Sequence, residues 1–207
     1  MSLLDLIFIR KCKLCGKSIS GGALCDECRK NIDSAISPVE RKLCVGGKTF
    51  HACSLLDYNN EHVKKLLFAL KRSSNKELFE FCASLFEKMI GSNFIHVVFV
   101  PRSRVNKRKY GYDHMQKIAK TLCKDGKYEY KPLLVRRPFT KEQKKLNSKD
   151  RIKNVSGAFK IKKNDITTDI VLVDDVITTG STAVSCITEI LNHNKDAFIK
   201  LYFLASK

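Results

Sequence analysis

The chain has 207 residues, and its 39 Lys and Arg against 21 Asp and Glu give a formal net charge of +18. This length allows one core of ordinary size and a small appendage. No apolar run reaches the length of a membrane-spanning helix, and Asp5 interrupts the apolar first residues, with no cleavage-site pattern after them. We therefore expect a cytoplasmic protein with no membrane insertion.

The positive charge is concentrated in the middle of the chain. Residues 101–163 hold 21 Lys and Arg against 5 Asp and Glu. A field this one-sided favours a polyanionic partner, either a nucleic acid or the phosphate groups of a small substrate, although a solvated basic surface would have the same composition. A membrane surface is disfavoured, because the basic residues do not lie along one helix with a large apolar face.

Four of the nine cysteines form two C-x-x-C pairs near the N-terminus: Cys12, Cys15, Cys25 and Cys28. Four thiolates at this spacing suit a tetrahedral Zn²⁺ ion, which would stabilise a segment too small to build its own core. A thioredoxin-like redox motif needs only one such pair and would leave the second unexplained. We predict a structural zinc lobe with its linker over residues 1–50, with residues 29–50 forming the linker and a short helix.

After residue 50, segments with the apolar pattern of a strand alternate along the chain with segments that have the apolar spacing of a helix. Strands are expected at residues 50–56, 95–100, 133–135, 155–161, 170–173 and 197–204. Helical spacing is found around residues 63–70, 78–89, 115–122 and 183–191. This alternation predicts an α/β domain over residues 51–207, with an open, mostly parallel sheet and flanking helices. The polar, lysine-rich residues 136–159 are expected to form a long mobile loop.

A basic loop follows the strand predicted at residues 95–100. Loops after the carboxyl ends of parallel strands are where open α/β sheets bind ligands. The candidates to contact pyrophosphate or a DNA backbone, in this loop and in the later basic segment, are Arg102, Arg104, Lys107, Arg108, Lys109, Arg137, Lys141 and Arg151. A solvated basic turn is the alternative interpretation of the first loop.

Aromatic residues are interleaved with these cations and are candidates to stack on bases: Tyr110, Tyr112, Tyr128, Tyr130 and Phe139. Packing in the core or in loops is the alternative interpretation, and it is the favoured one for Tyr128 and Tyr130. Nothing in the pattern specifies a base sequence, so binding to a nucleic acid is expected to be nonspecific and strongly salt-dependent.

The most specific motif is IVLVDDVITTGST, from Ile170 to Thr182. Its apolar start predicts a strand buried on both faces, which Asp174 and Asp175 follow directly. A hydroxyl-rich loop then leads into a helix, with the residues Thr178, Thr179, Gly180, Ser181 and Thr182. Such a loop suits a phosphate, whereas the carboxylates suit hydroxyl groups or Mg²⁺. The motif thus indicates a ribose 5-phosphate ligand; the alternative, an ordinary capped strand–turn–helix, leaves the acidic pair without a role.

This segment resembles the phosphoribosyl-pyrophosphate (PRPP) binding signature of type I phosphoribosyltransferases. The resemblance implies a type I phosphoribosyltransferase-like fold, in which Asp174 and Asp175 hold the ribose hydroxyl groups as the catalytic pair. It implies that residues 178–182 hold the 5′-phosphate, and that Mg²⁺ accompanies PRPP.

Two further features narrow the resemblance to the ComF family (ComFC type). They are the four-cysteine segment and, within the expected mobile loop, the spacing Thr140-x-x-Gln143-x-x-Leu146-x4-Arg151-x-x-Asn154. The chain departs from the family where Tyr110-Gly111-Tyr112-Asp113-His114 replaces the usual Arg-Gly-Phe-Asn-Gln. Arg108 and Lys109 are the candidates to replace the missing arginine.

The resemblance implies a PRPP-binding competence protein that handles incoming single-stranded DNA in natural transformation, beside a helicase-like competence protein. One alternative is an active phosphoribosyltransferase, which joins PRPP to a nitrogenous base and releases pyrophosphate. Another is a PRPP sensor that gates the binding of DNA or protein. The fold alone does not separate these functions.

Overall fold

A six-stranded sheet forms the centre of the protein. The computed structural model describes residues 10–91, 96–138, 157–162 and 169–207, and the strand order is β3-β4-β10-β9-β5-β6. The strands span Ile36–Val45 (β3), Lys48–Asp57 (β4), His96–Phe99 (β5), Glu129–Tyr130 (β6), Asp169–Ile177 (β9) and Phe198–Ser206 (β10). β3 is antiparallel to β4, and the other neighbouring strands are parallel. The prediction of an α/β protein with a mostly parallel sheet is confirmed.

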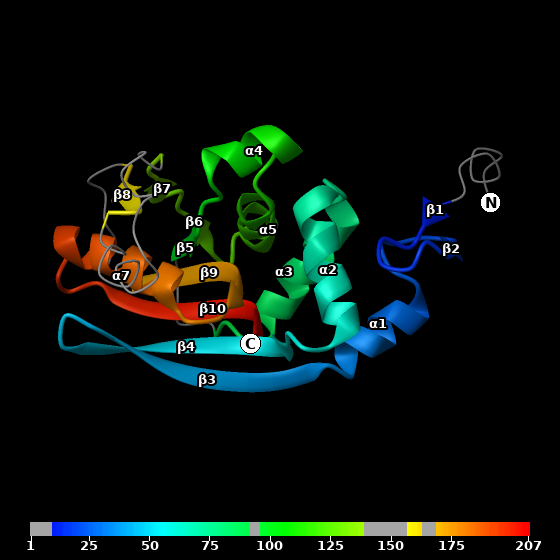
Figure 1. Cartoon of the computed structure of the whole chain (residues 1–207), viewed down its shortest axis with the longest axis horizontal. Coiled ribbons are helices and arrows are strands. Elements are labelled where there is room, and N and C mark those ends of the chain that lie inside the picture. The colour runs from blue at the N-terminus through cyan, green and yellow to red at the C-terminus, as the bar shows by residue number, and fades with distance from the viewer. Residues whose placement is uncertain (1–9, 92–95, 139–156, 163–168) are drawn as a thin grey trace, which may run out of the picture.

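Helices cover both faces of this sheet (Figure 1). Val97 and Val171 point to the face covered by α2, α3 and α5, whereas Val98 and Leu172 point to the face covered by α7. These helices span Glu61–Arg72 (α2), Lys76–Glu87 (α3), His114–Leu122 (α5) and Ser181–His193 (α7). Residues 97–99 of β5 and residues 170–173 of β9 are apolar because both faces of the sheet are buried at these residues. None of the helices in the described ranges has the length and apolar character needed to cross a membrane.

The four-cysteine segment packs directly on the domain. It contains β1 (Arg10–Lys11), β2 (Ser18–Ile19) and α1 (Asp26–Asp33), and it lies at one end of the molecule beside α2 (Figure 1). Leu24 and Ile32 belong to the same core cluster as buried side chains of α2 and α3. The Arg29 guanidinium also lies 5.1 Å from the ring centre of Phe81 on α3. The stability of this lobe is therefore coupled to that of the helical layer.

The interpretation of residues 29–50 as a linker is wrong for Ile36–Val45, which form the edge strand β3. An edge strand needs few apolar residues, and Pro38 is tolerated there because one side of the strand has no neighbour to bond. The expected short helix is α1. Residues 50–56 lie within β4, as predicted.

The basic segment after β5 is a helix, α4 (Arg104–Tyr110), where the sequence predicts a loop. Ser103 caps its start by accepting a hydrogen bond from the N–H of Asn106, and Gly111 ends it in the left-handed conformation. None of its residues is buried, so the segment carries no apolar period to indicate a helix.

A second, two-stranded sheet pairs β7 (Leu134–Arg136) with β8 (Phe159–Ile161). These strands correspond to the runs predicted at residues 133–135 and 155–161, but they pair antiparallel with each other and not with the main sheet. Most of the expected mobile loop lies outside the described residues, as do the candidate residues Thr140, Lys141, Gln143, Arg151 and Asn154.

Candidate functional site

The acidic pair lies at the carboxyl edge of the sheet. Phe99 is in register with Val173, and the N–H of Val100 donates to the carbonyl oxygen of Val173 at 3.0 Å. The segment after β5 therefore runs beside Asp174 and Asp175, which belong to the last part of β9. A cavity of about 320 Å³ opens here. Its lining side chains that carry charge or can titrate are Lys71, Arg102, His114, Arg136, Asp174 and Asp175.

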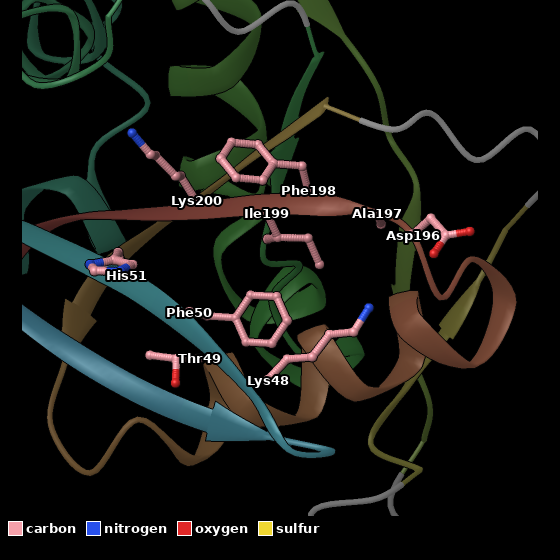
Figure 2. Close-up of a pocket in the computed structure, with 9 residues that line it drawn as sticks. All are labelled: Lys48, Thr49, Phe50, His51, Asp196, Ala197, Phe198, Ile199 and Lys200. Atoms are coloured by element: carbon pink, nitrogen blue, oxygen red, sulfur yellow. The ribbon is translucent and has the colours of Figure 1, made fainter.

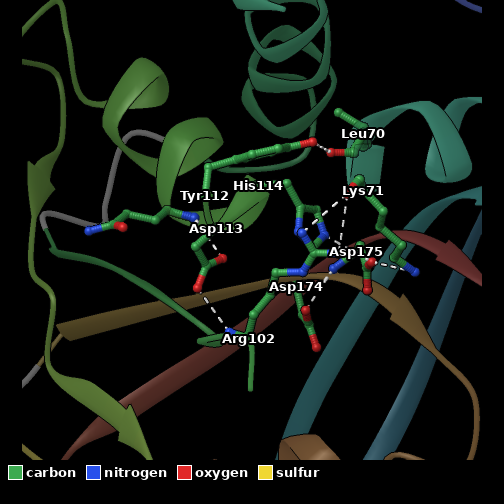
Figure 3. Close-up of polar contacts among 9 residues, drawn as sticks. Leu70, Lys71, Arg102, Tyr112, Asp113, His114, Asp174 and Asp175 are labelled. Atoms are coloured by element: carbon green, nitrogen blue, oxygen red, sulfur yellow. Dashed lines mark hydrogen bonds and ion pairs between the residues drawn. The ribbon is translucent and has the colours of Figure 1, made fainter. Parts of the chain in front are cut away.

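Asp175 is held by two basic side chains (Figure 3). Its Oδ2 atom lies 2.8 Å from Nζ of Lys71 and 3.0 Å from Nε2 of His114. Burial by itself would raise the pKa of the Asp175 carboxyl group, but the hydrogen bond from His114 and the charge of Lys71 outweigh it and hold this pKa well below its usual range. Asp175 is therefore a carboxylate at neutral pH.

Asp174 has the opposite environment. Burial and the neighbouring negative charge of Asp175 raise its pKa well above the usual range. Its Oδ1 atom accepts a hydrogen bond from the N–H of Asp175 at 2.9 Å. The pair thus combines one carboxylate with one carboxyl group that tends to keep its proton, so it can accept and donate hydrogen bonds to neighbouring hydroxyl groups.

The segment from Tyr110 to His114 contacts the end of α2 and leads into α5 (Figure 3). The buried carboxylate of Asp113 caps α5, accepts the N–H of Arg102 at 2.9 Å and lies 3.1 Å from Nζ of Lys107. The hydroxyl group of Tyr112 donates to the carbonyl oxygen of Leu70 at 2.7 Å. These contacts fix the position of His114, which begins α5.

The loop after β9 has the form of an anion site. Gly180 is the N-cap residue of α7 and provides no side chain to accept the first N–H groups of the helix. The N–H of Ser181 instead donates to Oγ1 of Thr179 at 3.4 Å, and the partial positive charge of the helix end favours an anion. A small cavity of about 30 Å³ is lined by Thr178, Gly180, Ser181 and Thr182. Thr182 also lines the larger cavity, so the loop and the acidic pair adjoin.

Two contacts brace this loop. Thr179 lines neither cavity and donates through its hydroxyl group to Oγ of Ser181 at 3.2 Å. The guanidinium of Arg41, on β3, donates to the carbonyl oxygen of Thr178 at 2.8 Å. Arg41 is a residue that the sequence pattern does not indicate, because it lies 137 positions away from its partner.

Replacing Gly180 with Ala is expected to destabilise the protein and to distort the loop. Gly180 has φ +76°, and a Cβ atom there would lie 2.9 Å from Cδ2 of Leu43. The left-handed conformation alone costs an alanine about 1–2 kcal/mol. Urea unfolding of Gly180→Ala measures the loss. Gly91→Ala is the matched control, because Gly91 has an ordinary φ and open space around it; equal stabilities of the two variants would contradict this account.

The predicted basic residues divide into two groups. Arg102 lines the large cavity, where its guanidinium donates to the carbonyl oxygen of Lys71 at 3.3 Å. Lys107 pairs with Asp113 and does not line the cavity. Four exposed cations also lie outside the cavity lining. They are Arg104, Arg108 and Lys109 on α4, and Arg137, which directly follows β7.

The aromatic candidates are mostly engaged in packing. Tyr128 is buried and donates to the carbonyl oxygen of Ile90, and the ring of Tyr130 stacks on Phe99 at 5.9 Å between ring centres. The favoured interpretation of these two tyrosines as packing residues is confirmed. The Tyr110 ring contacts two cations, Arg102 at 4.8 Å and Lys109 at 5.4 Å from its ring centre. Phe139 lies outside the described residues.

The four predicted cysteine ligands form a cluster that is positioned to bind a metal ion. Their Sγ atoms all lie within 4.8 Å of one another, and those of Cys15 and Cys25 are 3.7 Å apart. A tetrahedral zinc ion with Zn–S bonds of about 2.3 Å requires S–S separations of about 3.8 Å, so these thiols fit Zn²⁺. Burial opposes ionisation of Cys12, but hydrogen bonds from backbone N–H groups lower the pKa of its thiol to about 6. Cys12 is therefore ready to bind a metal as a thiolate at neutral pH.

A further cavity of about 320 Å³ lies at the opposite, amino ends of β4 and β10 (Figure 2). Figure 2 shows Ile199 directed toward Phe50, with Phe198 on the other side of β10. The Lys48 ammonium group donates to the carbonyl oxygen of Lys195, and His51 pairs with Glu40. We assign no function to this cavity.

No protein-family model matches the chain, and no curated protein sequence matches it. The structure defines an α/β protein with a mostly parallel six-stranded mixed sheet, flanking helices and a four-cysteine cluster near the N-terminus.

Sequence reasoning misses three residues with basic side chains that line the cavity of the acidic pair: Lys71, His114 and Arg136. Lys71 lies in the last turn of the amphipathic helix α2 and has no local signal for a site. The one signal that marks His114 is that residues 110–114 differ from the motif of the family that the sequence resembles. The contact between His114 and Asp175 joins residues 61 positions apart, so only the tertiary structure defines it.

Proposed function

We propose that the chain is a cytoplasmic PRPP-binding competence protein of type I phosphoribosyltransferase-like fold, which handles incoming single-stranded DNA in natural transformation. The observation that carries this proposal is that an acidic pair and a loop suited to an anion lie next to each other at one edge of a parallel sheet. Thr182 lines both the cavity of the loop and the cavity of Asp174 and Asp175. Ligands of open α/β sheets bind at this edge.

Each chemical group of PRPP has a suitable set of residues at this edge of the sheet. The 5′-phosphate suits the start of α7, and the ribose hydroxyl groups suit Asp174 and Asp175. The pyrophosphate suits the cations that line the same cavity: Lys71, Arg102 and Arg136. Mg²⁺ would accompany the pyrophosphate, since it is commonly bound through carboxylates together with substrate phosphates. In this proposal Zn²⁺ occupies the four-cysteine cluster as a structural ion.

The positive charge outside the cavity supports a polyanionic partner. Arg104, Arg108 and Lys109 are exposed on α4 and do not line the cavity. A single pyrophosphate would not use cations spread in this way, whereas a DNA backbone presents a phosphate at every nucleotide. The resemblance to the ComF family indicates single-stranded DNA as that polyanion and a helicase-like protein as a further partner.

Fluorescence anisotropy of labelled single-stranded DNA, at two salt concentrations and with and without PRPP and Mg²⁺, tests this proposal. We expect affinity that falls with salt and changes when PRPP is added. Replacing Arg104, Arg108 and Lys109 with Ala is expected to reduce the magnitude of the salt slope by about 2, because each lost phosphate contact changes the slope by ~0.7. The control with equal loss of charge replaces Lys42, Lys195 and Lys207, which are exposed elsewhere.

Absence of DNA binding at low salt would contradict the DNA-handling proposal. It would favour the second candidate, an active phosphoribosyltransferase, which the cluster of cations in the cavity supports because such groups stabilise a leaving pyrophosphate. Purine-type enzymes of this superfamily often place an acid near the base within the signature, where this chain has Thr178 and Thr179. Release of pyrophosphate with a panel of nitrogenous bases would identify an acceptor.

A further inference from the structure

The side chain of His114 has one polar contact in the described part of the chain. Its Nε2 atom lies 3.0 Å from Oδ2 of Asp175, and its Nδ1 atom is buried without a hydrogen-bond partner there. A buried nitrogen without a partner is unfavourable. The contact with Asp175 is therefore the polar interaction that favours an imidazole over an apolar side chain at this position.

Both basic partners of Asp175 contact the same oxygen atom. Nζ of Lys71 and Nε2 of His114 approach Oδ2, and among the described residues Oδ1 has no such partner and can accept from a ligand in the cavity that Asp175 lines. The terminal torsion of an Asp side chain has a broad energy profile, so its carboxylate plane turns easily unless it is held. Two donors on Oδ2 hold this plane in one orientation.

The two partners contribute in different ways. The side chain of Lys71 is 41% exposed, so solvent screens its charge and the side chain retains freedom to move. The side chain of His114 is 4% exposed. Its backbone is fixed at the start of α5 by the buried cap Asp113. His114 is thus the rigid partner and Lys71 the mobile, charged one.

We propose that His114 is a positioning residue, which orients the Asp175 carboxylate so that Oδ1 accepts a hydrogen bond from a ribose hydroxyl group. This inference rests on the proposed function, because it assumes that the cavity binds a ribose 5-phosphate group. It adds that the preference for ribose over deoxyribose depends on a residue that acts through its contact with Asp175.

Calorimetric titrations with ribose 5-phosphate, 2-deoxyribose 5-phosphate and inorganic phosphate test the inference. The parent protein is expected to bind ribose 5-phosphate about tenfold more tightly than the deoxy sugar, the low end of the effect of one hydrogen bond to a charged group. His114→Leu is expected to reduce this ratio to about twofold or less, with inorganic phosphate bound as in the parent. His114→Gln is expected to restore most of the ratio, because its amide group is a donor of similar reach.

His96→Leu is the matched control. Its half-buried ring also pairs with a carboxylate, at 3.2 Å from Glu129, but at the amino end of β5. Two results would overturn this inference but not the proposed function. In the first, His114→Leu keeps the parent's preference for ribose 5-phosphate over the deoxy sugar. In the second, His114→Gln shows no greater preference than His114→Leu. A parent protein that binds neither sugar phosphate nor PRPP would overturn the proposed function and the inference with it.

Discussion

Replacing Asp174 and Asp175 together with Asn is expected to weaken PRPP binding by about thirtyfold or more while the fold is retained. Each carboxyl group is proposed to bind a ribose hydroxyl group. A hydrogen bond to the charged Asp175 contributes about 1.5–3 kcal/mol, and one to Asp174, whose raised pKa favours its neutral form, contributes about 0.5–1.5 kcal/mol. A total of about 2 kcal/mol or more corresponds to a factor of about thirty or more, since each ~1.4 kcal/mol is tenfold in affinity. The fold is expected to persist. Asp174 already favours its neutral form, so replacing it with the neutral Asn changes the charge of the buried site little, and the double change also removes the repulsion between the two acids.

Isothermal titration calorimetry measures this loss, and circular dichroism checks that the variant is folded. Asp57→Asn is the control, because Asp57 is an exposed carboxylate that ends β4 at the same edge of the sheet. It does not line the cavity of the acidic pair. PRPP affinity in the double variant equal to that of Asp57→Asn would show that the acidic pair is not the ribose site.

Replacing Cys12 and Cys15 with Ser is expected to abolish zinc binding and to lower the stability of the whole domain. Two of four ligands are lost, and a lobe of this size depends on its metal to fold. Leu24 and Ile32 would lose their packing against α2 and α3, at roughly 1.5–3 kcal/mol for each buried side chain. A total of ~3 kcal/mol or more corresponds to a melting temperature lower by about 10 °C.

Elemental analysis of the purified protein gives the zinc content, and a thermal melt gives the change in stability. Cys44→Ser is the control for this pair, because Cys44 is an exposed cysteine outside the cluster. Zinc is expected at one ion per chain in the parent protein and in Cys44→Ser. A parent protein without bound metal would refute the zinc assignment, whatever the stability of the variants.

The parts of the fold that local patterns determine were predictable. The buried strand from Ile170 to Val173 shows a continuous apolar run because both of its faces are covered. The helix after Gly180 shows an apolar face that packs on the sheet. The two C-x-x-C pairs are brought together by short turns, so their spacing alone indicates the cluster.

The parts that were not predictable depend on long-range contacts or on exposed residues. α4 has no buried residue, so its helix leaves no apolar period in the sequence. β3 is an exposed edge strand that is defined by its pairing with β4. The environment of Asp175 is set by Lys71 and His114, which belong to two different helices. β3 and the environment of Asp175 follow from tertiary contacts, whereas the local signals of α4 are its caps, Ser103 and Gly111.

A calorimetric titration of PRPP with Mg²⁺ into the unmodified protein tests the central claim most directly. The account predicts saturable binding at one site per chain, which excess ribose 5-phosphate reduces by competition. Absence of binding at millimolar PRPP, in protein that circular dichroism shows to be folded and that contains its zinc, would contradict the account.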